Sequence, residues 1–391
     1  MEYLPQDLID EIVLRLPVKC LIRFSFVSKL WKAVIHSKDF IRKHRQRFNL
    51  NHLNDFALIR HHVESDPHDH FYSVTFSGDD TTLEEERLKH PLYSLEESDR
   101  LGLQSGIVAL CNGLILLHVR SKKYDLGLFL WNPMISKHKI IPTPFKWARG
   151  QFSNRMYGLG YHSAEDDLKV LVLTEDYDNR SNSLFGQRNL TMDLKVYSVA
   201  LNRWKRIEKL PPSNLRIYVN HQSNMVSMND SRVAWLMRDN DQLDLYMVVT
   251  FDLVKEEYQF FRVPILIRGP GVVKLMAFGG FLCFLRCYTG VCINVWFTKD
   301  CDSCWSLEPV VLNCKPLFFD GERFLLNQLN HDGNDKLTWY NIKTQKHDYG
   351  TEIRRHTRSN RCTETTLCVG DLSLLLDADP DGRRSYFGHV F

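Results

Sequence analysis

Apolar residues recur every three or four positions near the start of the chain, which is the spacing of amphipathic helices. One row consists of Ile9, Ile12, Val13 and Leu16, and a second row of Phe24, Val27, Trp31, Val34 and Ile35. Pro5 suits the first turn of a helix, whereas Pro17 cannot continue one, so a break is expected between the rows. Ser37 is placed to cap a further short helix that starts near Asp39. The pattern therefore predicts three short helices.

After residue 50 the apolar positions change to short strand-like runs joined by polar turns. Five runs form strand–turn–strand units at 128–141, 194–207, 248–263, 293–307 and 337–349. The aromatic residue near the end of each first strand falls at 131, 197, 251, 296 and 340, and the last three intervals are 54, 45 and 44 residues. A second strand type follows turns at Asn112-Gly113, Ser231, Gly279-Gly280, Gly321 and Gly370.

Two interleaved hairpin elements with a period in the forties are typical of four-stranded β-propeller blades. A β-sandwich also alternates strands and turns, but it does not predict a regular period. The sequence therefore favours a propeller and leaves the number of blades open. The 54–104 segment is less distinctive, and it is expected to supply outer strands or the closing blade.

The helical segment is too short to bury its own apolar residues well, because domains under about 40 residues usually need a metal, a disulfide or a partner. Two interpretations follow. The helices form a cap that packs on the rest of the chain, or they present apolar surface to another protein. At 391 residues the chain also exceeds the usual size of a single core, so two domains are expected.

Charge and hydropathy exclude several classes of function. The net charge of +3 is too close to neutral to predict nucleic-acid or membrane binding. The start of the chain lacks the pattern of a secretory signal, and the longest apolar run, 275–285, is about half of a bilayer span. We therefore expect a soluble protein of the cytoplasm, the nucleus or both.

Catalytic and metal-binding patterns are mostly lacking. Six cysteines lie between 283 and 314, and Cys301 and Cys304 have ligand spacing, but a second such pair is missing, so a zinc site is not expected. His61, His62, His68 and His70 are expected to lie in a solvated loop. Phosphate-binding and nucleophile-elbow motifs are also missing. The sequence predicts no cofactor, no metal and no catalytic residue.

The segment from Leu4 to His44 resembles an F-box, the adaptor-binding motif of ubiquitin ligase receptors of the Skp–cullin–F-box (SCF) type. The matching runs are Leu4-Pro5, the turn at 15–19, the run at 21–24 and the run at 27–31, with Ser28 where plant members often carry Cys. The resemblance implies residues that face a Skp-type adaptor or support the surface that does: Leu4, Pro5, Ile9, Ile12, Leu16, Pro17, Leu21, Val27 and Trp31.

Residues 105–350 resemble the kelch-like F-box-associated domain of plant F-box proteins, the group that includes S-locus F-box proteins. The motifs include Cys111-Asn112-Gly113-Leu114, Trp131-Asn132-Pro133 and the run at 157–161. The expected fold is α+β and multidomain, with a three-helix F-box at 1–46 followed by an all-β, propeller-like domain at 47–391.

This resemblance implies the substrate-recognition subunit of an SCF ligase, with a cullin and a RING subunit reached through the adaptor. Such a receptor is not itself an enzyme, and it brings a target to ubiquitination and proteasomal degradation. Two alternatives stay open: a propeller-type glycan-binding module and an interaction protein that acts without the cullin. The polar connections at 176–189 and 239–244 are candidates for target binding.

Overall fold

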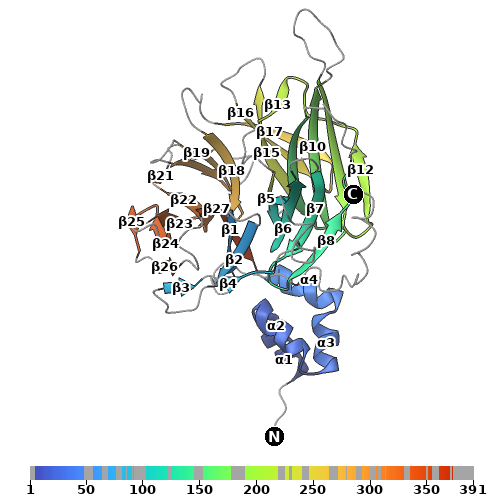
Figure 1. Cartoon of the computed structure of the whole chain (residues 1–391), viewed down its shortest axis with the longest axis vertical. Helices are drawn as coiled ribbons and strands as arrows, with labels where there is room; N and C mark the ends of the chain where they lie inside the picture. The colour runs from blue at the N-terminus through green and yellow to red at the C-terminus, as the bar shows by residue number, and fades with distance from the viewer. Residues whose placement is uncertain are drawn as a thin grey trace, which may run out of the picture. The chain divides into compact units, whose positions relative to one another are not determined.

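The computed structural model contains four helices followed by β-strands (Figure 1). It describes residues 5–47, 56–63, 69–75, 82–84, 86–89, 91, 103–121, 125–144, 153–177, 190–218, 225–228, 231–239, 246–263, 272–278, 280–287, 293–299, 305–306, 310–312, 314–329, 335–348, 351–354, 361–369 and 372. Leu4, His68, Cys301, Cys304 and most of the two polar connections lie outside this part of the chain.

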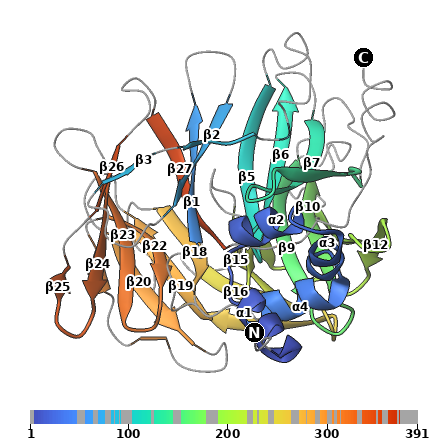
Figure 2. The same ribbon diagram turned by 90° about the horizontal axis from the view of Figure 1, so that it is seen from below.

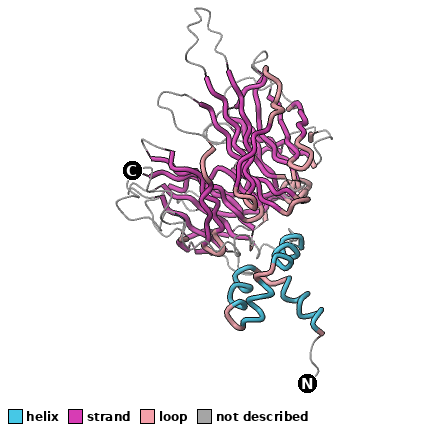
Figure 3. The backbone as a smooth tube through the Cα atoms, turned by 90° about the vertical axis from the view of Figure 1, so that its right-hand side faces the viewer, coloured by secondary structure: helices cyan, strands magenta, loops and turns pink. Residues whose placement is uncertain are grey.

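The helices are α1 (Gln6–Leu14), α2 (Val18–Ser25), α3 (Lys29–Ile35) and α4 (Lys38–Arg47), drawn in cyan in Figure 3. The prediction of three helices is wrong by one, because the second apolar row is interrupted between Ser25 and Lys29. Ser28 has an extended backbone, and its hydroxyl accepts a hydrogen bond from Trp31 N at 3.1 Å, which starts a new helix. The predicted cap at Ser37 is confirmed, since its hydroxyl accepts from Phe40 N at 3.2 Å.

The strands of the described segments form six sheets. The chain divides into two compact units, of which one holds 1–107, 112–143 and 355–391 and the other holds 108–111 and 144–354. In the first unit, β27 (Arg361–Val369), β1 (Phe56–Val63), β2 (Asp69–Thr75) and β4 (Glu86–Arg87) form one sheet in that order. A second sheet orders β5 (Leu103–Cys111), β6 (Leu114–Ser121), β7 (Asp125–Asn132) and β8 (Lys137–Ile141), and the last four residues of β5 are assigned to the second unit. The short strand β3 spans Thr82–Glu84.

The second unit holds four sheets. The first consists of β9 (Ser153–His162), β10 (Asp167–Tyr177), β11 (Leu190–Ser198) and β12 (Arg203–Ile207). The next consists of β13 (Leu215–Ile217), β14 (Val226–Ser227), β15 (Arg232–Asp239), β16 (Tyr246–Asp252) and β17 (Glu257–Arg262). Then come β18 (Val272–Phe278), β19 (Phe281–Cys287), β20 (Ile293–Thr298) and β21 (Val310–Leu312), and finally β22 (Lys315–Phe319), β23 (Arg323–Leu329), β24 (Asp335–Asn341), β25 (Lys346–His347) and β26 (Thr351–Arg354).

The repeated elements of the sequence map onto equivalent strands of these sheets. The recurring aromatic residues at 131, 197, 251, 296 and 340 lie on β7, β11, β16, β20 and β24. The turns after four of these strands share one conformation, with a left-handed residue at Ser136, Asn202, Glu256 and Gln345. The last residue of the strand caps each turn: for example, Asp252 Oδ1 accepts from Val254 N at 2.8 Å and Asn341 Oδ1 accepts from Thr344 N at 3.0 Å.

The sheet of β1, β2 and β4 is completed by a strand from the far end of the chain. β27 pairs antiparallel with β1, from Phe56 opposite Val369 to Val63 opposite Arg361 (Figure 2). The 54–104 segment therefore supplies strands of the closing sheet, as expected. The prediction of a solvated loop is wrong for His61, His62 and His70, which lie in β1 and β2 with His62 directly opposite His70.

Each sheet of the second unit packs its apolar face on the next. One core contains the fully buried Trp235 and Phe251, and another contains Phe284 of β19 and Trp296 of β20. The strand β9 lies very close to the next sheet, at Val233 of β15 and at Leu253, which follows β16. A Cβ at Gly160 would lie 2.7 Å from Leu253 Cδ1 and 2.7 Å from Val233 Cγ2. A glycine is therefore required at this position by packing, since side chains in a protein interior leave no free space of that size.

Candidate adaptor-binding surface

The F-box-like helices hold most of the exposed large apolar side chains of the described residues. Ten such side chains are exposed, and six of them lie on α1–α3 or in the turn between α2 and α3: Leu8, Ile12, Phe24, Phe26, Val27 and Leu30. Phe26 is 82% exposed, Val27 70% and Leu30 74%. Scattered exposed hydrophobic residues are ordinary, but a concentration of this kind marks an interaction site.

Local hydrogen bonds fix the α2–α3 turn so that its apolar side chains point outward. Phe26 N donates to Arg23 O at 3.1 Å, Val27 N donates to Phe24 O at 3.0 Å, and Ser25 Oγ donates to Ile22 O at 2.6 Å. We call Phe24, Phe26, Val27 and Leu30 the apolar corner. The N–H groups of Phe26 and Val27 are thus satisfied within the turn, so a partner that covers these residues does not have to supply acceptors for them.

A buried core lies beneath the exposed residues. Leu21 and Ile35 are fully buried, and Val13, Val18, Phe40 and Ile41 complete the cluster. The ring of Trp31 meets that of Phe24 edge-on, with centroids 6.1 Å apart. His44 is buried, and its Nε2 lies 3.1 Å from Leu16 O, which connects α4 to the end of α1. These contacts hold α1–α3 in place for the exposed side chains that they carry.

The predicted adaptor-binding residues divide into three groups. Pro5, Ile12 and Val27 are exposed, whereas Ile9, Leu16, Pro17 and Trp31 are half-buried. Leu21 is fully buried, so it supports the surface from below. Leu8, Phe24, Phe26 and Leu30 were missing from the predicted set. Phe24 belongs to the second apolar row, whereas Phe26 and Leu30 lie outside that row, and no periodicity singles them out.

The helices also pack on β-structure of their own unit. Met134 and Ile135, in the turn between β7 and β8, and Leu372 join the helical cluster. Lys19 Nζ lies 3.7 Å from Glu86 Oε2 of β4. The helices thus cap part of the β-structure, as the first interpretation expects, and they also expose apolar residues on α1–α3.

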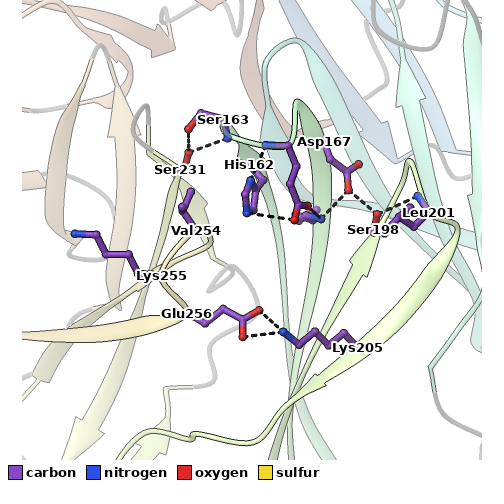
Figure 4. A network of polar contacts seen from close by, with 12 residues as sticks. His162, Ser163, Asp167, Ser198, Leu201, Lys205, Ser231, Val254, Lys255 and Glu256 are labelled. Atoms are coloured by element: carbon purple, nitrogen blue, oxygen red, sulfur yellow. Dashed lines mark hydrogen bonds and ion pairs between the residues drawn. The ribbon is translucent and has the colours of Figure 1, made fainter.

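In the second unit, a polar network at the strand turns ties neighbouring strands together (Figure 4). The buried Lys169 ammonium donates to Glu165 Oε2 at 2.6 Å and to Asp167 Oδ2 at 2.7 Å, and Asp167 accepts from Ala200 N at 2.9 Å. The Lys169 hydrogen bond lowers the pKa of Glu165. Burial acts to lower the pKa of Lys169, but the hydrogen bonds to Asp167 and Glu165 outweigh it, so the pKa is raised.

The same region joins two sheets. Ser231 Oγ donates to Ser163 Oγ at 2.7 Å, and Lys205 Nζ lies 2.6 Å and 2.8 Å from the two carboxylate oxygens of Glu256 (Figure 4). Because the charges of Lys169 and Lys205 are paired within the fold, the network has the character of a structural clamp.

Two thiols of the β-structure are held in their neutral form. Burial raises the pKa of the Cys283 thiol, and it raises the pKa of Cys314 to about 11. Neither group is a thiolate at neutral pH, which is the reactive form of cysteine. The described residues contain no group of three or more His, Cys, Asp or Glu side chains that could hold a metal ion. Within the same residues, no helix has the length and apolar character needed to cross a membrane.

Comparison with family models gives two matches. Residues 1–43 match the F-box domain, and residues 65–351 match the F-box associated beta propeller domain. The chain belongs to the F-box proteins that carry an F-box-associated propeller domain. It is 26% identical over 370 residues to F-box protein CPR1 of Arabidopsis thaliana, which covers 88% of this chain and 84% of that protein.

A second relative matches a similar share of the chain. Protein SUPPRESSOR OF NIM1 1 of Arabidopsis thaliana is 25% identical over 304 residues, covering 76% of this chain and 74% of that protein. Among solved structures, a lectin from Aleuria aurantia matches 78% of this chain and 97% of its own, with a TM-score of 0.41 and 9% identity.

Proposed function

We propose that this F-box protein is the substrate receptor of an SCF ubiquitin ligase. Its helices bind a Skp-type adaptor, which connects the chain to a cullin and a RING subunit, and its β domain captures a target protein. The receptor is not itself a catalyst. It acts in the cytoplasm, the nucleus or both by holding a target lysine close to a charged ubiquitin carrier, which raises the effective concentration of the reactants.

The observation that carries this proposal is the exposed apolar corner on helices that match the F-box. Burying one Phe or Leu side chain contributes about 1.5–3 kcal/mol. Phe26 and Leu30 are both largely exposed in the free chain, so a partner that covers them gains this free energy on binding. Loss of both is therefore expected to weaken adaptor binding by at least about 3 kcal/mol, or more than 100-fold.

The test is co-purification of the full chain with the adaptor, cullin and RING subunit. The variant Phe26→Ser with Leu30→Ser is expected to lose all three partners. The control is Leu201→Ser with Val254→Ser, two exposed apolar residues in turns of the β domain (57% and 45% exposed), which is expected to retain them. Retention of the adaptor by the first variant contradicts the proposal. An adaptor that arrives without cullin favours an interaction protein that acts outside the ligase.

A further inference from the structure

The apolar corner lies in a segment of the chain that has positive charges and no negative ones. Between Ile12 and Lys38 the sequence contains no Asp and no Glu, and its cations are Arg15, Lys19, Arg23, Lys29, Lys32 and Lys38. The whole chain is nearly balanced, with 50 Lys and Arg against 47 Asp and Glu, so this excess is local. Charges across an interface are usually complementary, so a surface that covers the apolar corner is expected to carry negative charge next to these cations.

Three of these cations, Arg23, Lys29 and Lys32, lie beside the apolar corner in α2 and α3 and are available to a partner. Arg15 pairs with Glu11 at 2.9 Å, and Lys19 lies 3.7 Å from Glu86. Arg23, Lys29 and Lys32 are exposed, and none of them forms an ion pair with another described residue. Arg23 precedes Phe24 in the last turn of α2, while Lys29 and Lys32 flank Leu30 in α3.

The titration of a neighbouring histidine agrees with a positive local potential. Burial is the main cause that lowers the pKa of His36, and the charges of Lys32 and Lys137 lower it further. Lys137 lies at the start of β8, directly after the turn whose Met134 and Ile135 pack on the helices. Lys137 of the β-structure therefore contributes to the positive potential that His36 experiences beside α3.

We propose, on the basis of the adaptor-binding function above, that the surface which receives the apolar corner is an apolar pocket with an acidic rim. Arg23, Lys29 and Lys32 then steer the adaptor into place, while Phe26, Val27 and Leu30 supply the affinity. Charges at the rim of an interface act mainly on the association rate and its salt dependence, whereas buried apolar anchors act on dissociation.

The test measures association and dissociation rates of the full chain with a purified Skp-type adaptor. Neutralising all three residues (Arg23→Gln, Lys29→Gln, Lys32→Gln) is expected to slow association about tenfold at about 0.1 M salt, with dissociation changed less than twofold. Replacing the same three with Glu is expected to slow association further. Near 1 M salt, where charges are screened within about 3 Å, both variants are expected to associate as fast as the unaltered chain.

The control is Arg203→Gln, Lys209→Gln and Lys255→Gln, which removes three exposed cations from the β domain and so changes the net charge equally. Equal slowing by this control means that only net charge matters and overturns the proposal. Unchanged association by the Gln and Glu variants also overturns it, while adaptor binding itself still supports the receptor function. No adaptor binding by the unaltered chain rejects that function. Cosedimentation with phosphatidylserine vesicles that is lost in the Gln variant assigns the corner to a lipid surface instead.

Discussion

Replacing Gly160 with alanine is expected to destabilise the β domain by steric overlap. Gly160 lies on β9 opposite Lys169 of β10, and its backbone is not in the left-handed region. A Cβ there would lie 2.7 Å from both Leu253 Cδ1 and Val233 Cγ2, whereas carbon atoms in contact prefer about 3.5–4.0 Å. Both neighbours are buried, so the overlap can be relieved only by moving packed side chains or strands.

The expected cost is about 1–3 kcal/mol, the usual range for an added methyl group in a well-packed core. Gly106 on β5 provides the matched control, because a Cβ there would meet nothing within 4 Å. Gly106→Ala is expected to be neutral or to stabilise the protein by about 0.4–1 kcal/mol, since alanine restricts the unfolded chain. The two substitutions make the same chemical change, but Gly160→Ala is expected to lower the free energy of unfolding, whereas Gly106→Ala is expected to leave it unchanged or to raise it.

The assay is chemical denaturation of the full chain, followed by tryptophan fluorescence and compared through midpoints. A third variant, Leu253→Ala with Gly160→Ala, is expected to cost less than the sum of the single changes, because the new methyl group fills part of the space that the leucine leaves. A Gly160→Ala midpoint equal to that of Gly106→Ala would refute the packing argument. Adaptor co-purification is expected to persist in all three variants, since the F-box helices are untouched.

The remaining predictions concern the helices, the polar network and the thiols. Leu21→Ala should cost about 2–5 kcal/mol and abolish adaptor binding, because Leu21 is fully buried under the exposed apolar residues; circular dichroism and co-purification check this. The fragment 1–46 should be poorly ordered alone, because Met134, Ile135 and Leu372 complete its core; a cooperative thermal transition of the fragment would count against this. Lys169→Met should make the free energy of unfolding less dependent on pH. The lowered pKa of Glu165 stabilises the fold above the ordinary value of 4.5, and this stabilisation is lost on acidification. The raised pKa of Lys169 stabilises the fold below 10.5, and this stabilisation is lost at higher pH. Iodoacetamide should leave Cys283 unmodified in the folded protein and label it after unfolding, as mass spectrometry can show.

Local signals made the F-box helices and the repeated strands predictable. The helix break at Pro17 and the helix cap at Ser37 each depend on residues within one helical turn. The recurring aromatic residues mark equivalent strands of successive sheets. The additional helix was also encoded locally, by the Ser28 cap, but the continuous apolar spacing across it concealed the break. Sequence periodicity thus identified the elements better than it identified their ends.

Non-local contacts explain what the sequence did not reveal. His61 and His62 were expected in a loop, yet β1 is paired on both sides, by β2 and by β27 from the far end of the chain. Pairing over such a separation leaves no trace in a window of a few residues. The exposure of a side chain also depends on non-local contacts. Phe26 and Leu30 are residue types that usually lie in a core, and they are exposed because of the way in which α2 and α3 pack.

The buried helical cluster and the exposed apolar corner have opposite consequences for stability. Met134, Ile135 and Leu372 complete its core from within the chain, while Phe24, Phe26, Val27 and Leu30 remain uncovered. A partner that binds only the folded helices stabilises them by mass action, by about 2.7 kcal/mol when its free concentration is 100 times its dissociation constant. For a segment of this size that increment is comparable with the core itself. The adaptor proposed here would then govern what fraction of the receptor has folded helices as well as whether the receptor reaches the ligase.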